Sequence, residues 1–301
     1  MTTQVRLASA PINWGIETPD GAGNPSADEV LQNSADAGYT GFELGPLHYL
    51  GADATAIGNR LAAYGLDAVA FWVAVPLAQP FGGVAEAGIR EALETLNAVG
   101  AQHLLVSDFG DPARLAVISR VDAHPETWWS DDDWAEVRRS FIAIGQLAGD
   151  YGIDISVHPH VGGHIESGRE IEKALVAIEG TPITVCIDTG HIRIGGIDSI
   201  PLMRRLGTRV THIHAKDVEP SLLARMQQGE IGYFDAVGAG LYCDLGQGMV
   251  DWQGLAGAVD AIGYDGWVVA EEDQLLVPGR RAPFESNIAN RAFLAQLFGV
   301  S

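Results

Sequence analysis

Short β-rich runs alternate with longer amphipathic runs eight times along this chain of 301 residues. The expected strands cover residues 5–10, 40–44, 67–75, 103–107, 154–158, 183–188, 210–214 and 267–271. The expected helices cover residues 26–37, 54–64, 84–99, 131–151, 169–178, 199–206, 252–262 and 285–297. Repeated strand-then-helix units predict a parallel sheet. Eight such units at this length predict an α/β fold, a (β/α)8 TIM barrel that forms one domain over residues 1–301.

The main alternative to a barrel is an open, doubly wound sheet. A dinucleotide site in such a sheet needs a G-x-G-x-x-G run after the first strand, and this chain has none there. Three connections are long: residues 108–130, residues 218–250 and the tail after residue 272. Long loops in compact domains tend to be functional, and in a barrel the loops that follow strands lie on the catalytic face.

The charge balance limits the partners that the protein can bind. The chain has 18 Lys and Arg against 39 Asp and Glu, a formal net charge of −21. Nucleic acids and anionic membranes need a basic face, so we expect neither as a partner, whereas a metal ion is attracted by an acidic field. Cys186 and Cys243 are too few for a disulfide framework. With no signal peptide and no apolar run of spanning length, we expect a cytoplasmic protein.

Four successive expected strands each end on a side chain that can hold a metal. These residues are His158, Asp188, His214 and Glu271. Because the carboxyl ends of parallel barrel strands meet at one mouth, we expect the four side chains to converge there. Imidazole and carboxylate without thiolate suit Mn, Co, Fe, Zn or Mg at a catalytic site. The alternative is that the carboxylates cap helices and the histidines pack in the core.

Local motifs at these strand ends supply candidates for proton transfer. His160 lies two residues beyond the first candidate ligand, and Glu166 follows in the same loop. A turn at Gly190 brings His191 back over the mouth, and Lys216 lies where it can reach a substrate oxygen. Imidazoles have pKa values near neutrality, whereas a carboxylate needs burial to act in the same range. The lysine is otherwise an ordinary loop residue.

Three more residues at strand ends are candidates for contacts with a substrate. Trp14 and Trp72 can stack on a sugar ring, and Glu43 can bind hydroxyl groups. The alternative for the carboxylate is a buried pair with a neighbouring cation. His212 shares a strand face with His214 but lies one layer deeper, so we expect it to pack or to support the ligand above it.

Several segments resemble the xylose-isomerase-like TIM-barrel superfamily of sugar isomerases, epimerases and dehydratases, and within it the inosose dehydratase (2-keto-myo-inositol dehydratase) branch. They are Ala10-Pro11-Ile12-Asn13-Trp14-Gly15, Gly41-Phe42-Glu43-Leu44-Gly45-Pro46, His158-Pro159-His160-Val161-Gly162-Gly163, Asp188-Thr189-Gly190-His191, His212-Ile213-His214-Ala215-Lys216-Asp217, Gly246-Gln247-Gly248 and Gly266-Trp267 with Glu271-Glu272-Asp273-Gln274. The resemblance covers nearly the whole chain.

The resemblance implies a divalent metal, commonly Mn or Co, held by His158, Asp188, His214 and Glu271. In the epimerase branch the first ligand is a glutamate, so His160 is an alternative to His158. A second departure is Leu47-His48-Tyr49, where the family usually has Tyr-Gly-Tyr. Members of the superfamily are often homo-oligomers.

The implied reaction is loss of water from a keto-polyol such as 2-keto-myo-inositol, by removal of the proton α to the carbonyl and metal stabilisation of the enediolate. The same chemistry serves two alternatives: elimination of an aglycone or anhydro oxygen from a 3-keto sugar, and epimerisation or isomerisation of a ketose. A non-catalytic sugar-binding role is disfavoured by the full ligand set. The net charge disfavours the branch of DNA-repair nucleases that shares this fold.

Overall fold

The computed structural model describes residues 4–275 and 282–300. Its parallel sheet has the strand order β3-β2-β1-β11-β8-β7-β6-β5-β4. The strands are β1 (Arg6–Ser9), β2 (Gly41–Phe42), β3 (Asp67–Ala68), β4 (Ala70–Val75), β5 (His103–Asp108), β6 (Asp154–Val157), β7 (Thr184–Asp188), β8 (Val210–Ala215) and β11 (Trp267–Ala270). This arrangement confirms the predicted TIM barrel.

The barrel closes through its third strand, which the sequence predicted as one run over residues 67–75. The structure divides it at Val69 into β3 and β4. Gly41 of β2 pairs with Asp67 in β3, whereas Ala70 in β4 pairs with His103 of β5. The first part of this strand, β3, therefore bonds to β2, and the second part, β4, bonds to β5. Counting β3 and β4 as one interrupted strand, the nine strands correspond to the eight strands of a TIM barrel.

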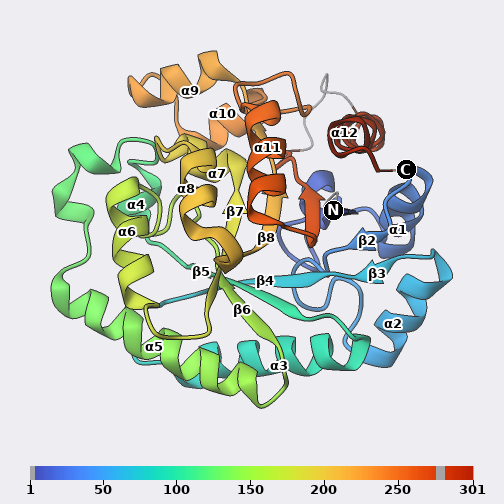
Figure 1. Ribbon diagram of the computed structural model, residues 1–301, viewed down its shortest axis with the longest axis horizontal. Coiled ribbons are helices and arrows are strands. Elements are labelled where there is room, and N and C mark those ends of the chain that lie inside the picture. The colour runs from blue at the N-terminus through green and yellow to red at the C-terminus, as the bar shows by residue number, and fades with distance from the viewer. Residues whose placement is uncertain (1–3, 276–281, 301) are drawn as a thin grey trace.

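All eight expected helices are confirmed, and they surround the sheet (Figure 1). They are α1 (Ala27–Asp36), α2 (Ala54–Ala63), α3 (Gly83–Val99), α5 (Asp131–Gly149), α6 (Gly168–Ala177), α8 (Ser199–Leu206), α11 (Trp252–Ile262) and α12 (Pro283–Phe298). Their apolar faces pack on the sheet to form the main hydrophobic core. Among the described residues, no helix is both long and apolar enough to cross a membrane.

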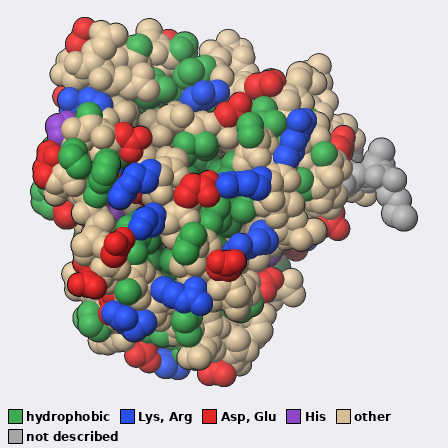
Figure 2. Space-filling view, turned by 60° about the vertical axis from the view of Figure 1, so that its left-hand side comes forward, with side chains coloured by type: hydrophobic (Ala, Val, Ile, Leu, Met, Phe, Trp, Pro, Cys, Tyr) green, Lys and Arg blue, Asp and Glu red, His purple; other side chains and the backbone are tan. Residues whose placement is uncertain are grey.

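The barrel interior contains mostly small apolar side chains, among them Ala8, Ala70 and Cys186. Small residues here leave space for buried polar groups, and both Glu43 and His212 are buried. The cysteines Cys186 and Cys243 are free thiols. On the face shown in Figure 2, acidic and basic side chains are interspersed rather than separated by sign.

Several connections that we expected to be loops contain helices. Residues 108–130 form α4 (Pro112–Leu115), η2 (Val121–Ala123) and η3 (Pro125–Thr127), and η1 (Pro11–Trp14) follows β1. After β7 the chain turns directly into α7 (Thr189–Ile194). Each element is too short to show a helical period in the sequence. Part of the third long connection, after residue 272, lies outside the described residues.

Residues 217–250 form a folded unit that we call the insertion. It contains β9 (Asp217–Val218), α9 (Pro220–Gln227), α10 (Tyr233–Ala239) and β10 (Tyr242–Cys243), and β9 pairs antiparallel with β10. The two helices pack against each other at one edge of the molecule (Figure 1). Apolar residues of the insertion, such as Leu223 and Val237, form a hydrophobic cluster that is separate from the main core.

Candidate functional site

The four predicted metal ligands converge at the carboxyl ends of neighbouring strands. His158 follows β6, Asp188 ends β7, His214 lies in β8 and Glu271 follows β11, and all four are buried. His214 Nδ1 lies 3.0 Å from Glu271 Oε2 and 3.5 Å from Asp188 Oδ2. His158 Nε2 lies 3.6 Å from Asp188 Oδ2. The structure therefore brings these residues together, and their role as ligands remains a prediction.

Three atoms in this cluster fit a shared cation. His158 Nε2, Asp188 Oδ2 and His214 Nδ1 are buried, and within the described ranges none of them has a hydrogen-bond partner. Most buried polar atoms in proteins have such a partner. The ligand atoms of Asp188, His214 and Glu271 lie within 4.8 Å of one another. Buried carboxylate and imidazole atoms at this spacing match the donors that first-row divalent metals accept.

The two oxygens of Asp188 have different functions. Oδ1 accepts hydrogen bonds from the backbone N–H groups of Gly190 and His191, at 2.8 Å each, and so caps α7. Oδ2 is directed toward the other candidate ligands and lies 3.3 Å from Lys216 Nζ. Burial opposes the charge on this carboxylate, but the lysine ammonium holds its pKa well below the ordinary value. Helix capping therefore leaves one oxygen available for a metal.

Glu43 lies beneath the cluster and holds two histidines. Its Oε1 accepts hydrogen bonds from His212 Nε2 at 2.7 Å and from His214 Nε2 at 3.0 Å. Because an ionised carboxylate only accepts, both histidines carry a proton on Nε2. Burial disfavours the charge on Glu43, but these partners lower its pKa. A carboxylate partner of this kind is typical of histidines that bind metals. The predicted contact of Glu43 with substrate remains a prediction.

Lys216 places a positive charge beside the cluster. Its Nζ donates to Asp273 Oδ1 at 2.7 Å and lies 3.1 Å from Glu271 Oε2. Burial disfavours the ammonium, but Asp188 and the other carboxylates raise its pKa well above the ordinary value. The side chain is therefore an ammonium that carries its full charge at neutral pH. Asp273 was not a predicted site residue, although the acidic run from Glu271 to Asp273 was a visible signal.

His191 bonds to both the barrel and the insertion. Its Nε2 lies 3.1 Å from Lys216 Nζ, and its Nδ1 lies 3.2 Å from Tyr242 Oη. Because the ammonium only donates, Nε2 accepts, so Nδ1 carries the proton that is shared with Tyr242. Tyr242 Oη lies a further 3.1 Å from Tyr233 Oη. Sequence reasoning missed both tyrosines, because nothing in a loop-like stretch indicates that it folds back over the mouth.

His160 lies in the mouth with one nitrogen available. Its Nδ1 donates to the backbone carbonyl of Val161 at 2.8 Å, which leaves Nε2 unprotonated. Its ring centroid lies 3.8 Å from that of His191 and 5.6 Å from that of Trp72. Burial and the neighbouring His158 lower its pKa to about 3, so the imidazole is neutral at physiological pH and Nε2 has a free lone pair.

The remaining candidates have other surroundings. Trp72 is 39% exposed, which suits a contact with substrate. Trp14 is buried in the main hydrophobic core. The oxygens of Glu166 accept from the backbone N–H groups of Ser119 and Gly162, at 2.7 and 2.8 Å, and burial raises its pKa to about 7. Its carboxylate joins two loops rather than the histidine cluster, and its predicted catalytic role remains a prediction.

A buried ion pair supports the loop that carries His160. The Arg114 guanidinium on α4 donates to both Glu170 oxygens at 2.9 Å, and its Nε donates to the Gly163 carbonyl at 3.0 Å. Glu170 also accepts from the backbone N–H groups of Glu166 and Ser167. The folded 108–130 connection therefore fixes the shape of the loop after β6, which the sequence did not reveal.

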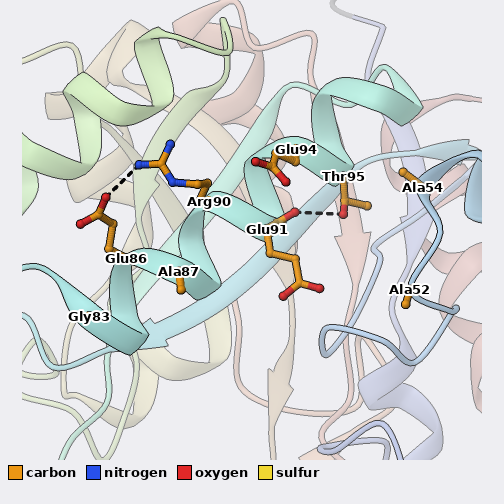
Figure 3. Close-up of a pocket in the computed structure, with 9 residues that line it drawn as sticks. All are labelled: Ala52, Ala54, Gly83, Glu86, Ala87, Arg90, Glu91, Glu94 and Thr95. Atoms are coloured by element: carbon orange, nitrogen blue, oxygen red, sulfur yellow. Dashed lines mark hydrogen bonds and ion pairs between the residues drawn. The ribbon is translucent and has the colours of Figure 1, made fainter.

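A separate surface cavity of about 590 Å³ lies along α3 (Figure 3). Its charged side chains include Glu86 and Arg90, which bond to each other at 2.8 Å and are exposed to solvent. Exposed, paired charges of this kind are common on protein surfaces. The buried cluster at the barrel mouth is therefore the stronger candidate for chemistry.

Comparisons with known proteins agree with this geometry. A family model described as xylose isomerase-like TIM barrel matches residues 31–289. An inosose dehydratase from Geobacillus thermodenitrificans is 27% identical over 300 residues, which are 99% of this chain and 98% of that protein. A structure of L-ribulose 3-epimerase superposes with a TM-score of 0.71 at 15% identity, covering 98% of this chain and 95% of that one. A zinc-bound structure of the protein IOLI gives 0.69 at 12% identity, covering 98% of each chain.

Proposed function

The chain belongs to the xylose isomerase-like TIM barrel family, and from this we propose that it is a divalent-metal-dependent hydro-lyase that removes water from a keto-polyol such as 2-keto-myo-inositol. The observation that carries the proposal is a set of three buried Lewis bases at the mouth that accept or donate no hydrogen bond within the described residues, next to a neutral imidazole and a lysine ammonium. The name and nearly full-length alignment of the Geobacillus relative support the substrate class.

His158, Asp188, His214 and Glu271 would hold the metal, and their mixed nitrogen and oxygen donors suit Mn or Co. When bound, the ion supplies Lewis acidity that stabilises negative charge on a ketone oxygen. Glu43 keeps the His214 ring oriented through Nε2, at 3.0 Å, so that Nδ1 faces the cluster. The hydrogen bonds beneath the site therefore support the proposed metal site, as the ligand set does.

His160 is the proposed base, because its unprotonated Nε2 can take the proton from the carbon next to the ketone. The leaving hydroxyl needs a proton as its carbon–oxygen bond breaks, and Lys216 Nζ, 3.1 Å from His191 Nε2, is the proposed donor. The two proton-transfer groups come from different strands, so they can act at adjacent carbons of one substrate. The half-exposed Trp72 would cover an apolar face of the ring. We expect this chemistry in the cytoplasm, with homo-oligomers as the assembly.

Mass spectrometry of the reaction with 2-keto-myo-inositol tests the proposal. Enzyme loaded with Mn²⁺ or Co²⁺ is expected to convert the substrate to a product lighter by one water. His160→Gln is expected to lower kcat by about 10²- to 10⁴-fold, the usual contribution of a general base. The matched control is His124→Gln, since His124 is partly exposed and its imidazole is paired with the exposed Glu126 instead of with a residue of the cluster.

The outcome also separates the alternatives. A new sugar of unchanged mass indicates an epimerase or isomerase. No reaction with the keto-polyol, together with elimination from a 3-keto-glycoside, indicates the eliminase. Either result rejects dehydration as the activity.

A further inference from the structure

Ser107 lies at the end of β5, is fully buried, and contacts the first candidate ligand. Its Oγ lies 2.8 Å from Trp72 Nε1, 2.8 Å from the backbone carbonyl oxygen of His158 and 3.0 Å from His158 Nδ1. Sequence reasoning gave this serine no role. Its three contacts join a half-exposed tryptophan at the mouth to a buried histidine.

The chemistry of these groups leaves one arrangement of protons. An indole N–H only donates and a carbonyl oxygen only accepts, whereas a serine hydroxyl has one proton and two lone pairs. The hydroxyl proton of Ser107 must therefore go to the His158 carbonyl. Its lone pairs then accept from Trp72 Nε1–H and from His158 Nδ1–H. Every donor and acceptor is satisfied when the His158 proton is on Nδ1.

The consequence appears on the opposite side of the imidazole. With the proton on Nδ1, neutral His158 has a lone pair on Nε2. This buried atom has no hydrogen-bond partner in the described ranges and lies 3.6 Å from Asp188 Oδ2. A lone pair directed at a carboxylate oxygen is repulsive unless a cation lies between them. The protonation that Ser107 enforces is thus the one that a metal ligand needs.

We propose that Ser107 is a positioning residue for the metal: it fixes the tautomer and orientation of His158 so that Nε2 binds the ion, and Trp72 occupies the remaining lone pair of the hydroxyl. This inference rests on the metal site of the proposed function. It selects His158 over His160 as the first ligand, because Nε2 of His158 lies 3.6 Å from Asp188 Oδ2.

The test is a calorimetric titration of the metal-free protein with Mn²⁺ and with Co²⁺. Ser107→Ala is expected to weaken binding by about 10- to 100-fold, the usual cost of losing the partner of a ligand histidine. The matched control is Ser156→Ala in β6, a buried strand serine whose hydroxyl bonds to Thr184 and Thr211 instead. Native affinity in the Ser107 variant, or an equal loss in the control, overturns the proposal.

A second measurement reads the tautomer directly. Nitrogen-15 NMR of labelled histidines in metal-free protein is expected to show His158 protonated on Nδ1. This N–H signal should be lost or shifted in Ser107→Ala but unchanged in Ser156→Ala. A native His158 protonated on Nε2 overturns the inference even if the variant folds poorly.

The two proposals fail in distinguishable ways. A native protein that binds the metal but does not dehydrate the keto-polyol rejects the reaction and leaves the Ser107 test intact. A native protein that binds neither ion rejects the metal site and the role of Ser107 together.

Discussion

Asp217 offers a test of how much one buried carboxylate stabilises the insertion. The side chain is fully buried, and its two oxygens accept five hydrogen bonds. Oδ1 accepts from the backbone N–H groups of Val218 and Val250, at 2.9 and 3.1 Å. Oδ2 accepts from the backbone N–H groups of residues 246 and 248 and from the indole of residue 252, at 2.9 to 3.0 Å. The carboxylate therefore joins β9 to the start of α11.

Asp217→Asn keeps the shape of the side chain but replaces one acceptor oxygen by an NH₂ group. In either orientation the NH₂ faces at least two N–H donors, so at least two hydrogen bonds to a charged group are lost. At about 1.5–3 kcal/mol for each such bond, the free energy of unfolding should fall by about 3–6 kcal/mol. With an unfolding entropy of about 2.1 cal/mol/K per residue, a chain of this length should lose roughly 5–10 °C in Tm.

Urea and thermal unfolding followed by circular dichroism measure this loss. The matched control is Asp251→Asn, which makes the same change at the exposed N-cap of α11, where Oδ1 accepts from Gly254 N at 2.9 Å. Asparagine caps helices about as well as aspartate, so the control should stay within about 0.5 kcal/mol of the native protein. If Asp217→Asn unfolds within about 1 kcal/mol of this control, the hydrogen-bond reasoning is wrong.

Three further predictions follow from the site and the barrel. Asp188→Ala should abolish metal content as measured by elemental analysis, whereas Asp198→Ala, which removes only an exposed helix cap, should keep it. Tyr242→Phe removes the acceptor of an imidazole N–H and should lower kcat about tenfold with little change in KM; Tyr151→Phe, which removes a hydroxyl that bonds to Glu94 on a barrel helix, should leave both unchanged. Burial lowers the pKa of His103 to about 4, so only the unfolded state binds its proton between pH 6.5 and 4. As the pH falls from 6.5 to 4, the free energy of unfolding should decrease by up to about 3 kcal/mol. Thermal melts across this pH range measure the decrease, and a decrease of the same size in His103→Asn would contradict the prediction.

The barrel was predictable because its long elements repeat a clear pattern. Helices such as α3 and α5 each contain several turns, and Gly100 in the left-handed conformation ends α3. The split of the third strand at Val69 was not visible, because strand pairing, and not composition, decides where the run is interrupted. The helices of the insertion are too short to show a period, and they are held by packing against each other and against residues of other loops, such as Ile118 and Val161.

The convergence of the candidate ligands was also predictable, since strand order brings the carboxyl ends of a parallel barrel to one mouth. The residues that form hydrogen bonds to these ligands could not be predicted from the sequence. Ser107 faces Nδ1 of His158 and Tyr242 faces Nδ1 of His191. Which nitrogen each one faces depends on the tertiary structure, so the sequence did not indicate it. Glu166 shows the reverse case: it lies close to a metal-type motif in the sequence, yet its oxygens bond to loop backbone.

The two tyrosines of the insertion link its packing to the mouth. Tyr242 belongs to the hydrophobic cluster of the insertion and Tyr233 packs against it, and their hydroxyl groups extend the hydrogen bonds of His191. Exchange of residues 219–243 between family members would therefore change the groups around His191 while the strands that hold the candidate ligands stay the same. The same exchange would also replace the packing of the insertion, so a change at the mouth and a change in stability are expected together.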